Sequence, residues 1–152
     1  MSRAFVKEQE SVDELPERLI SEHPNLVTSD GLKQIEAEVA RFDAAHAAAQ
    51  ADGDREAMAA TARDLRYWSA RLGTAEVVSV PADGGHVHFG STVTIEREDG
   101  RRQTYRIVGE DEADPAHGSI SFVSPLARSL AGKAVGDTVK VAGSDAEIVA
   151  IA

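Results

Sequence analysis

The sequence predicts an α+β protein in which an antiparallel helical hairpin precedes a small antiparallel β-sheet with one short helix. Three patterns support this fold class. Apolar residues recur every three and four positions on both sides of a short polar turn. From residue 75 onward the apolar period falls to two, which is typical of strands. A Ser-Pro pair followed by a glycine then marks the start and end of a short helix.

Residues 1–27 are expected to form an extended or disordered arm. Pro16 and Pro24 interrupt any helix, and charged residues dominate the segment. A solvated tail is the favoured interpretation, although four apolar side chains could dock on a surface: Leu15, Leu19, Ile20 and Leu26. We assign the hairpin to residues 28–73 and the sheet domain to residues 74–152.

The hairpin follows from two heptad seams. Thr28 is the expected N-cap of the first helix, whose seam consists of Leu32, Ile35, Val39, Phe42, His46 and Ala49. Gly53 suits a reversal and Asp54 suits a second N-cap. The second seam consists of Met58, Thr61, Leu65, Trp68 and Leu72. Gly73 is the expected C′ residue of the second helix. Each helix then has about 20 residues and is roughly 30 Å long.

The strands of the second half are expected at 75–80, 86–97, 102–109, 120–124, 137–143 and 146–152. Asp99 and Gly100 indicate a tight hairpin between the second and third of these. Ser124 is expected to cap the short helix, with Pro125 at its first position and Gly132 at its end.

Composition narrows the possible functions. The 152 residues include 26 acidic against 16 basic ones, and the net charge of −10 opposes strong binding to bare nucleic acid. The absence of cysteine excludes disulfides and thiolate chemistry, and 5% aromatic residues argue against a deep aromatic pocket. No apolar run is long enough to span a membrane, and the N-terminus lacks a secretory signal. We therefore expect a cytoplasmic protein with no membrane partner.

Four segments in the second half resemble the C-terminal module of the GreA/GreB family of bacterial transcript cleavage factors. They are TAEVV (74–78), FGSTVTI (89–95), YRIVGEDEAD (105–114) and ISFVSPLARSLAGKAVGD (120–137). The resemblance covers about half of the chain. It implies an FKBP-like C-terminal domain that docks on RNA polymerase at the rim of its secondary channel. The coiled coil would then point toward the active centre of the polymerase.

The resemblance also implies the docking residues, because the family places its polymerase contact at the start of the short helix. We therefore expect docking through Ser124, Pro125, Leu126 and Arg128. Helix-start chemistry alone explains the same Ser-Pro pair, and both roles can hold together. Val123 stands where the family often has a polar residue.

In the family, two acidic tip residues in a D-x-x-E-N context help hold a Mg²⁺ ion and a water for hydrolysis of backtracked RNA. This sequence lacks that motif and places Asp52, Asp54 and Glu56 around the turn. Turn and capping chemistry is the alternative explanation for these acids. The hairpin also looks several turns shorter. Each missing turn withdraws the carboxylates by about 5.4 Å, whereas Mg²⁺ needs ligands at about 2.1 Å.

We therefore expect an accessory regulator that binds RNA polymerase without efficient transcript cleavage, rather than an enzyme. Its layout with a short hairpin resembles that of a related group of proteins, the regulators of nucleoside diphosphate kinase. The protein should have no cofactor of its own, and Mg²⁺ shared with the polymerase is the only candidate. The alternative is a true cleavage-stimulating factor that uses its acidic tip. A prolyl isomerase is disfavoured because fold alone does not define function, and an aromatic cage is not evident.

Three further patterns have a functional and a structural interpretation. His86 and His88 lie two residues apart, a spacing that can bind metal, but without a third ligand an exposed strand pair is favoured. The acidic loop at 110–118 could attract a cation, but it lacks the EF-hand pattern and a solvated loop is favoured. Phe42 and Trp68 are expected to pack in the hairpin rather than stack on bases.

Overall fold

The computed structural model describes residues 15–79 and 84–152, which divide into two compact units. The first unit, called here the hairpin unit, combines the described residues up to Glu22 with Lys33–Ala75. The second, called the sheet unit, combines His23–Leu32 with Glu76–Ala152. Most of the expected arm, residues 1–14, and the end of the expected strand at residue 80 lie outside the described residues. Within the described part, no helix has both the length and the apolar character that crossing a bilayer requires.

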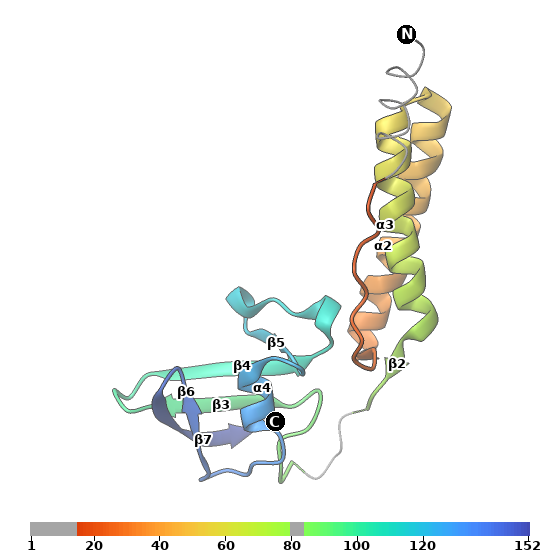
Figure 1. The fold of residues 1–152 in the computed structure, drawn as a ribbon. Helices are drawn as coiled ribbons and strands as arrows, with labels where there is room; N and C mark the ends of the chain where they lie inside the picture. Colours follow the sequence, from red (N-terminus) through yellow and green to blue (C-terminus); the bar gives the residue numbers. More distant parts are fainter. Residues whose placement is uncertain (1–14, 80–83) are drawn as a thin grey trace. The chain divides into compact units, whose positions relative to one another are not determined.

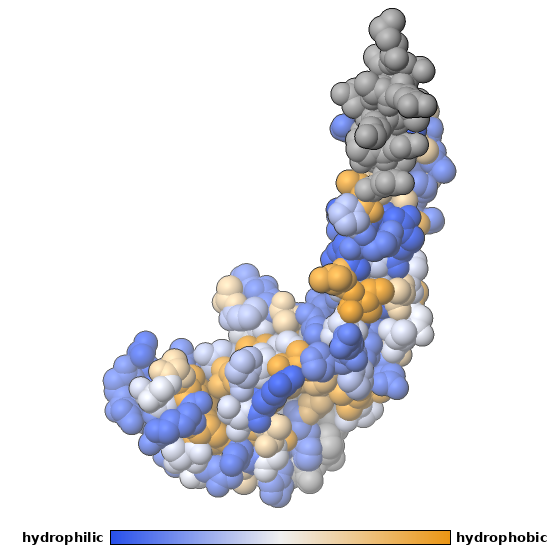
Figure 2. Space-filling view, viewed as in Figure 1, coloured by the Kyte–Doolittle hydropathy of each residue, from blue (hydrophilic) through white to orange (hydrophobic). Residues whose placement is uncertain are grey.

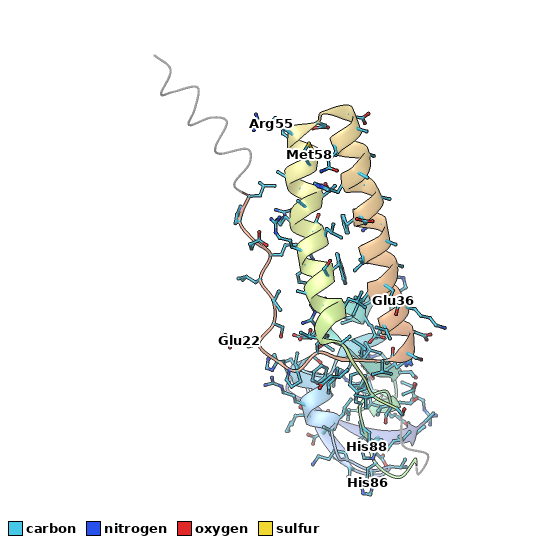
Figure 3. The ribbon with its side chains drawn as sticks, turned by 90° about the vertical axis from the view of Figure 1, so that its right-hand side faces the viewer. Glu22, Glu36, Arg55, Met58, His86 and His88 are labelled. Atoms are coloured by element: carbon cyan, nitrogen blue, oxygen red, sulfur yellow. The ribbon has the colours of Figure 1, made fainter. Side chains whose placement is uncertain are left out.

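Two long helices, α2 (Ser29–Asp52) and α3 (Arg55–Thr74), lie side by side as the predicted hairpin (Figures 1 and 3). All the predicted seam residues are buried or half-buried, with Ile35 and Ala49 the most buried. Glu36 and Arg41, which fall outside the seam, are exposed. The apolar period therefore identified the face on which each helix packs.

The turn between the helices is a Schellman motif. Gly53 has φ +65°, and its N–H donates to the Gln50 carbonyl at 3.2 Å. The Asp54 N–H donates to the Ala49 carbonyl at 3.1 Å. The Asp54 carboxylate then accepts the Ala57 N–H at 3.1 Å and caps α3. The predicted reversal and the predicted second cap are both confirmed.

The predicted C′ role of Gly73 was wrong. Gly73 lies inside the last turn of α3, which continues to Thr74, and Gly73 is not in the left-handed region. Ala75 is extended and leads straight into strand β2 (Glu76–Val77). Because the chain leaves the helix in an extended conformation, no left-handed residue is needed there.

Strand β2 belongs to a separate two-stranded parallel sheet with β1 (Leu26–Val27). The Glu76 N–H donates to the Asn25 carbonyl at 2.9 Å, and the Val78 N–H donates to the Val27 carbonyl at 3.0 Å. The expected strand over 75–80 is therefore much shorter than predicted. The last residues of the expected arm are also ordered as a strand, because they pair with a segment about 50 positions downstream.

The main sheet has five strands in the order β5-β4-β3-β7-β6 (Figure 1). Their bounds are β3 (Thr92–Arg97), β4 (Arg102–Val108), β5 (Ser119–Ser121), β6 (Thr138–Val141) and β7 (Ser144–Ile151). The prediction of a purely antiparallel sheet was wrong, because β4 and β5 pair in parallel. Residues 109–118 form two short 3₁₀ turns, η1 (Glu110–Glu112) and η2 (Pro115–His117), and carry the chain back so that β5 runs in the direction of β4.

Strand β3 begins six residues later than predicted. Gly90 has φ +86°, and the Ser91 hydroxyl accepts the His88 N–H at 2.9 Å, so a turn precedes the strand. The predicted β3–β4 hairpin is confirmed, with Gly100 at φ +85° and the Gly100 N–H donating to the Arg97 carbonyl at 2.9 Å.

The short helix α4 (Pro125–Leu130) supplies part of the core of the sheet unit. Gly132 follows it with φ +76°, as predicted for its end. The core consists of strand residues, residues of α4 and one residue of the loop before β3: Val87, Val93, Ile95, Ile107, Ile120, Ala127, Leu130, Val139, Ala146 and Ile148. The implied sheet domain with one short helix is thus present.

Candidate functional site

The hairpin tip presents the three predicted acidic residues on exposed positions. Asp52 is the last residue of α2, Asp54 lies in the turn, and Glu56 is in the first turn of α3. Arg55 and Met58 lie at the same end of the hairpin (Figure 3). The Asp54 carboxylate is engaged in capping α3, whereas Asp52 and Glu56 present their side chains at the surface.

These acids do not form a metal centre by themselves. Among residues 15–79 and 84–152, no three His, Cys, Asp or Glu side chains are arranged to hold a metal ion. Mg²⁺ prefers near-octahedral oxygen coordination, so an ion at this tip would need ligands from water or from another molecule.

A polar pair joins the two helices close to the tip. His46 Nδ1 lies 3.1 Å from the Thr61 hydroxyl, and the same hydroxyl lies 2.6 Å from the Ala57 carbonyl. A neutral imidazole nitrogen and a hydroxyl can each donate or accept, so this pair forms one hydrogen bond between the helices. His46 also lines a hollow of about 300 Å³ together with Arg55, Met58 and Ala59. A polar pair in an apolar seam fixes the register of the two helices.

The predicted docking residues have different environments around the start of α4. Ser124 caps the helix by accepting the Ala127 N–H at 3.3 Å, and Pro125 occupies the first helical position. Pro125 and Arg128 are exposed. Leu126 is half-buried and packs against the core of the sheet unit. The structure therefore brings Pro125 and Arg128 to one surface, while Ser124 and Leu126 also have structural roles.

The other candidate patterns have structural explanations in the fold. His86 and His88 lie in the irregular loop before β3 (Figure 3), so the expected strand pair was wrong. Asp114 accepts a hydrogen bond from His117 Nδ1 at 2.7 Å in an exposed pair. Phe42 and Trp68 are half-buried in the hairpin unit, in agreement with the packing interpretation.

Sequence reasoning missed the role of Glu112. The acidic loop was expected to be solvated, but Glu112 is half-buried and accepts the Thr28 N–H at 3.0 Å. It also accepts the Gly109 N–H at 3.1 Å. Thr28 is the predicted N-cap, and its hydroxyl accepts the Gly31 N–H at 3.0 Å. One carboxylate therefore connects the beginning of α2 with the loop after β4.

Sequence reasoning also missed how the arm docks. Charged residues hold the arm: Glu17 pairs with Arg66 at 2.5 Å, and Arg18 pairs with Asp64 at 3.2 Å. The Arg18 guanidinium also lies 3.9 Å from the Tyr67 ring centroid. Residues 15–22 are thereby held along α3.

Of the four apolar arm residues, Leu19 and Ile20 stay exposed, whereas Leu15 and Leu26 are half-buried. Leu19 is 96% exposed and Ile20 is 49% exposed. Figure 2 shows apolar surface on the hairpin unit. The arm is therefore fixed by charge and ring contacts while it presents apolar side chains to solvent.

The fold defines a two-unit protein that joins a helical hairpin with a polar tip to a mixed sheet with one short helix. The family model described as "Transcription elongation factor, GreA/GreB, C-term" matches residues 82–152. GreA of Desulfovibrio desulfuricans is 37% identical over 138 residues, which cover 90% of this chain and 82% of that protein. The chain therefore belongs to the GreA/GreB family of transcription elongation factors, and the resemblance seen in the sequence is confirmed.

Other relatives match over shorter stretches. GreA of Thioalkalivibrio sulfidiphilus is 46% identical over 94 residues, which span 57% of this chain and 60% of that protein. Among solved structures, Gfh1 of Thermus thermophilus is similar over 86% of this chain and 99% of that chain, with 18% identity and a TM-score of 0.42.

The two acids that flank Gly53 should differ in their effect on stability. Asp54→Ala removes the acceptor for the Ala57 N–H and should lower the free energy of unfolding by about 1 kcal/mol. Asp52→Ala is the matched control at the end of α2 and should change it by less than about 0.5 kcal/mol. Thermal unfolding followed by helical circular dichroism measures both. Equal losses would contradict the assignment of the cap.

Arm docking should depend on pH through Glu17. Its hydrogen bond with Arg66 lowers the pKa of the Glu17 carboxyl. The pair is therefore fully formed above the ordinary glutamate pKa and is lost as the pH falls through the lowered pKa. Trp68 is the only tryptophan and lies 5.7 Å from the Arg18 guanidinium, so its fluorescence should report release of the arm.

A substitution isolates this effect from general acid titration. Glu17→Gln should give the released-arm fluorescence at neutral pH, whereas Glu22→Gln on the same arm should behave like the wild type. Added salt should shift the wild type toward the released state, because these charges are exposed. Identical fluorescence from the wild type and Glu17→Gln at neutral pH would show that Glu17 does not hold the arm.

Proposed function

We propose that this protein is a transcription elongation regulator that binds RNA polymerase. Its sheet unit docks at the rim of the secondary channel, and its short hairpin enters the channel without efficient stimulation of transcript cleavage. The protein acts in the cytoplasm as an accessory factor, and any RNA cleavage is carried out by the polymerase active site. Membership of the GreA/GreB family, which includes a relative aligned over 90% of this chain, is the observation that supports this proposal most directly.

The surface around the start of α4 supports docking. Pro125 is rigid and exposed at the first helical position, and Arg128 is exposed in the last turn. An arginine beside a rigid apolar ring offers a partner both charge and contact area. Neither side chain belongs to the core cluster, so a partner can bind them without unfolding the unit.

The chemistry of the tip supports regulation without cleavage. Helices of 24 and 20 residues give arms of about 36 and 30 Å. Of the three tip acids, Asp54 is committed to its cap, and the D-x-x-E-N motif is absent. A Mg²⁺ ion shared with the polymerase would have to use Asp52 or Glu56, whose carboxylates are exposed. Their use in this way would make the protein a true cleavage factor, which is the alternative.

Docking can be tested with a double substitution at α4. Pro125→Ala combined with Arg128→Ala should weaken binding to core RNA polymerase by at least about tenfold, because the pair would remove more than 1.4 kcal/mol of binding free energy. Fluorescence anisotropy of labelled protein measures the affinity. Leu126 is left intact because it packs against the core.

The matched control is Arg101→Ala, an exposed arginine in the β3–β4 turn. It should leave the affinity unchanged, and both proteins should retain the thermal unfolding midpoint of the wild type. Unchanged polymerase affinity in the double variant would refute docking through α4. Absence of binding by the wild type would refute the proposed function itself.

Transcript cleavage separates the two candidate functions. With a stalled complex that contains backtracked RNA, the wild-type protein should not accelerate Mg²⁺-dependent shortening of the transcript beyond the rate of polymerase alone. Acceleration that is lost in Asp52→Asn with Glu56→Gln, and kept in Asp43→Asn on the side of α2, would instead establish the cleavage factor. Asp54 is retained in all three proteins because its loss uncaps α3.

A further inference from the structure

At the beginning of α2, the helix itself has no side chain that can accept the N–H of its N-cap residue. In a capping box, a Glu or Gln at the third helical position accepts the N–H of the N-cap residue. Here that position is Gly31, which has no side chain, and the N-cap is Thr28. Thr28 is only 4% exposed, so water has little access to satisfy its N–H.

Glu112 replaces the missing residue from 84 positions downstream. Its carboxylate accepts the Thr28 N–H at 3.0 Å and also accepts the hydroxyl proton of Thr28. The Thr28 hydroxyl remains free to accept the Gly31 N–H at 3.0 Å. A carboxylate at this end of a helix is further stabilised by the partial positive charge of the helix N-terminus.

The same carboxylate fixes a second segment of the sheet unit. It accepts the Gly109 N–H at 3.1 Å and so caps η1, the 3₁₀ turn after β4. A Cβ on Gly31 would overlap the Glu112 side chain, and a Cβ on Gly109 would overlap the Leu26 carbonyl. Both glycines are therefore needed for the close approach of these segments.

The remaining contacts around this point are weaker or independent of Glu112. Arg106 and Asp30 lie 3.8 Å apart with side chains that are 41% and 66% exposed, so their pair adds little. The β1–β2 pairing holds Leu26 and Val27 through backbone hydrogen bonds. Loss of Glu112 should therefore loosen the first turn of α2 while the rest of the sheet unit stays folded.

From these contacts we propose that Glu112 is a positioning residue for the hairpin. It fixes the first turn of α2, and the rest of the same helix forms one arm of the hairpin. The maximal effect of the protein on elongation therefore depends on Glu112, whereas its affinity for the polymerase does not. This inference rests on the proposed function, in which docking and hairpin entry use different parts of the chain.

Backbone hydrogen exchange tests the local step on the purified full chain. Glu112→Ala should accelerate exchange of the Thr28 and Gly31 amides by roughly 10- to 100-fold, as expected for lost hydrogen bonds to a charged group. The Ala57 amide, capped at the other end of the hairpin, should be unchanged. Glu98→Ala removes an exposed carboxylate from the same unit and is the matched control.

Two further variants distinguish hydrogen bonding from a general loss of stability. Glu112→Gln keeps one carbonyl acceptor and should restore most of the protection, because Gln also serves in capping boxes. Gly31→Ala should behave like Glu112→Ala, although alanine favours a helix interior over glycine. Stabilisation of the first turn by Gly31→Ala would overturn the inference.

The functional test titrates stalled and elongating polymerase with the protein. It compares the protein concentration that gives half of the maximal effect on elongation with the size of the effect at saturation. In Glu112→Ala the concentration for half-maximal effect should stay near the wild-type value, while the effect at saturation falls several-fold. Glu112→Gln should recover most of that effect. An unchanged effect at saturation, or unchanged amide exchange, would overturn the inference. If the wild type has no effect on polymerase, the proposed function fails, and the functional role of Glu112 fails with it.

Discussion

The hydrogen bonds of a single carboxylate determine how α2 begins. Helix α2 has 24 residues, of which Ser29–Leu32 belong to the sheet unit and the remainder to the hairpin unit. The N–H groups of the first turn of a helix have no acceptors within the helix. Where that turn is buried, acceptors must come from other parts of the chain. Glu112 supplies the acceptor for Thr28, whose N–H and hydroxyl both donate to its carboxylate. Gly31 leaves room for the Glu112 side chain, and Gly109 leaves room for the Leu26 carbonyl.

The hairpin was predictable because its signals are local. Heptad spacing identifies the packed face, and the Gly53-Asp54 pair identifies both the reversal and the new cap within two residues. The prediction failed at Gly73, where the helix ends by running into a strand instead of by a left-handed residue. The sequence pattern cannot show that difference, since it depends on the pairing of β2 with β1.

The sheet and the candidate site were predictable in part. Alternation located most strands, but it does not encode strand direction, so the parallel β4–β5 pair was missed. The cap at Ser124 and the acidic residues of the tip lie where expected because caps and turns are short-range features. Family membership follows from segments of the second half and from the longer alignment to a GreA relative.

The contacts that escaped prediction join residues far apart in the sequence. Arg18 reaches Asp64 and Tyr67, and Glu112 reaches Thr28, and no periodicity links such partners. One signal was present: glycine at the third position of a predicted helix, where a glutamate would complete the cap, indicates that another group occupies the space. The exposed Leu19 shows the converse, since an apolar residue in an arm need not be the one that docks.

The separation of 84 residues between Thr28 and Glu112 also orders events during synthesis on the ribosome. Residues 33–75 contain the packed length of both hairpin helices, and contacts between neighbouring segments form early as a chain emerges. The acceptor for the start of the first helix is translated much later, together with the loop after β4. A nascent chain that stalls before codon 112 therefore exposes a paired hairpin whose first turn has not yet been secured.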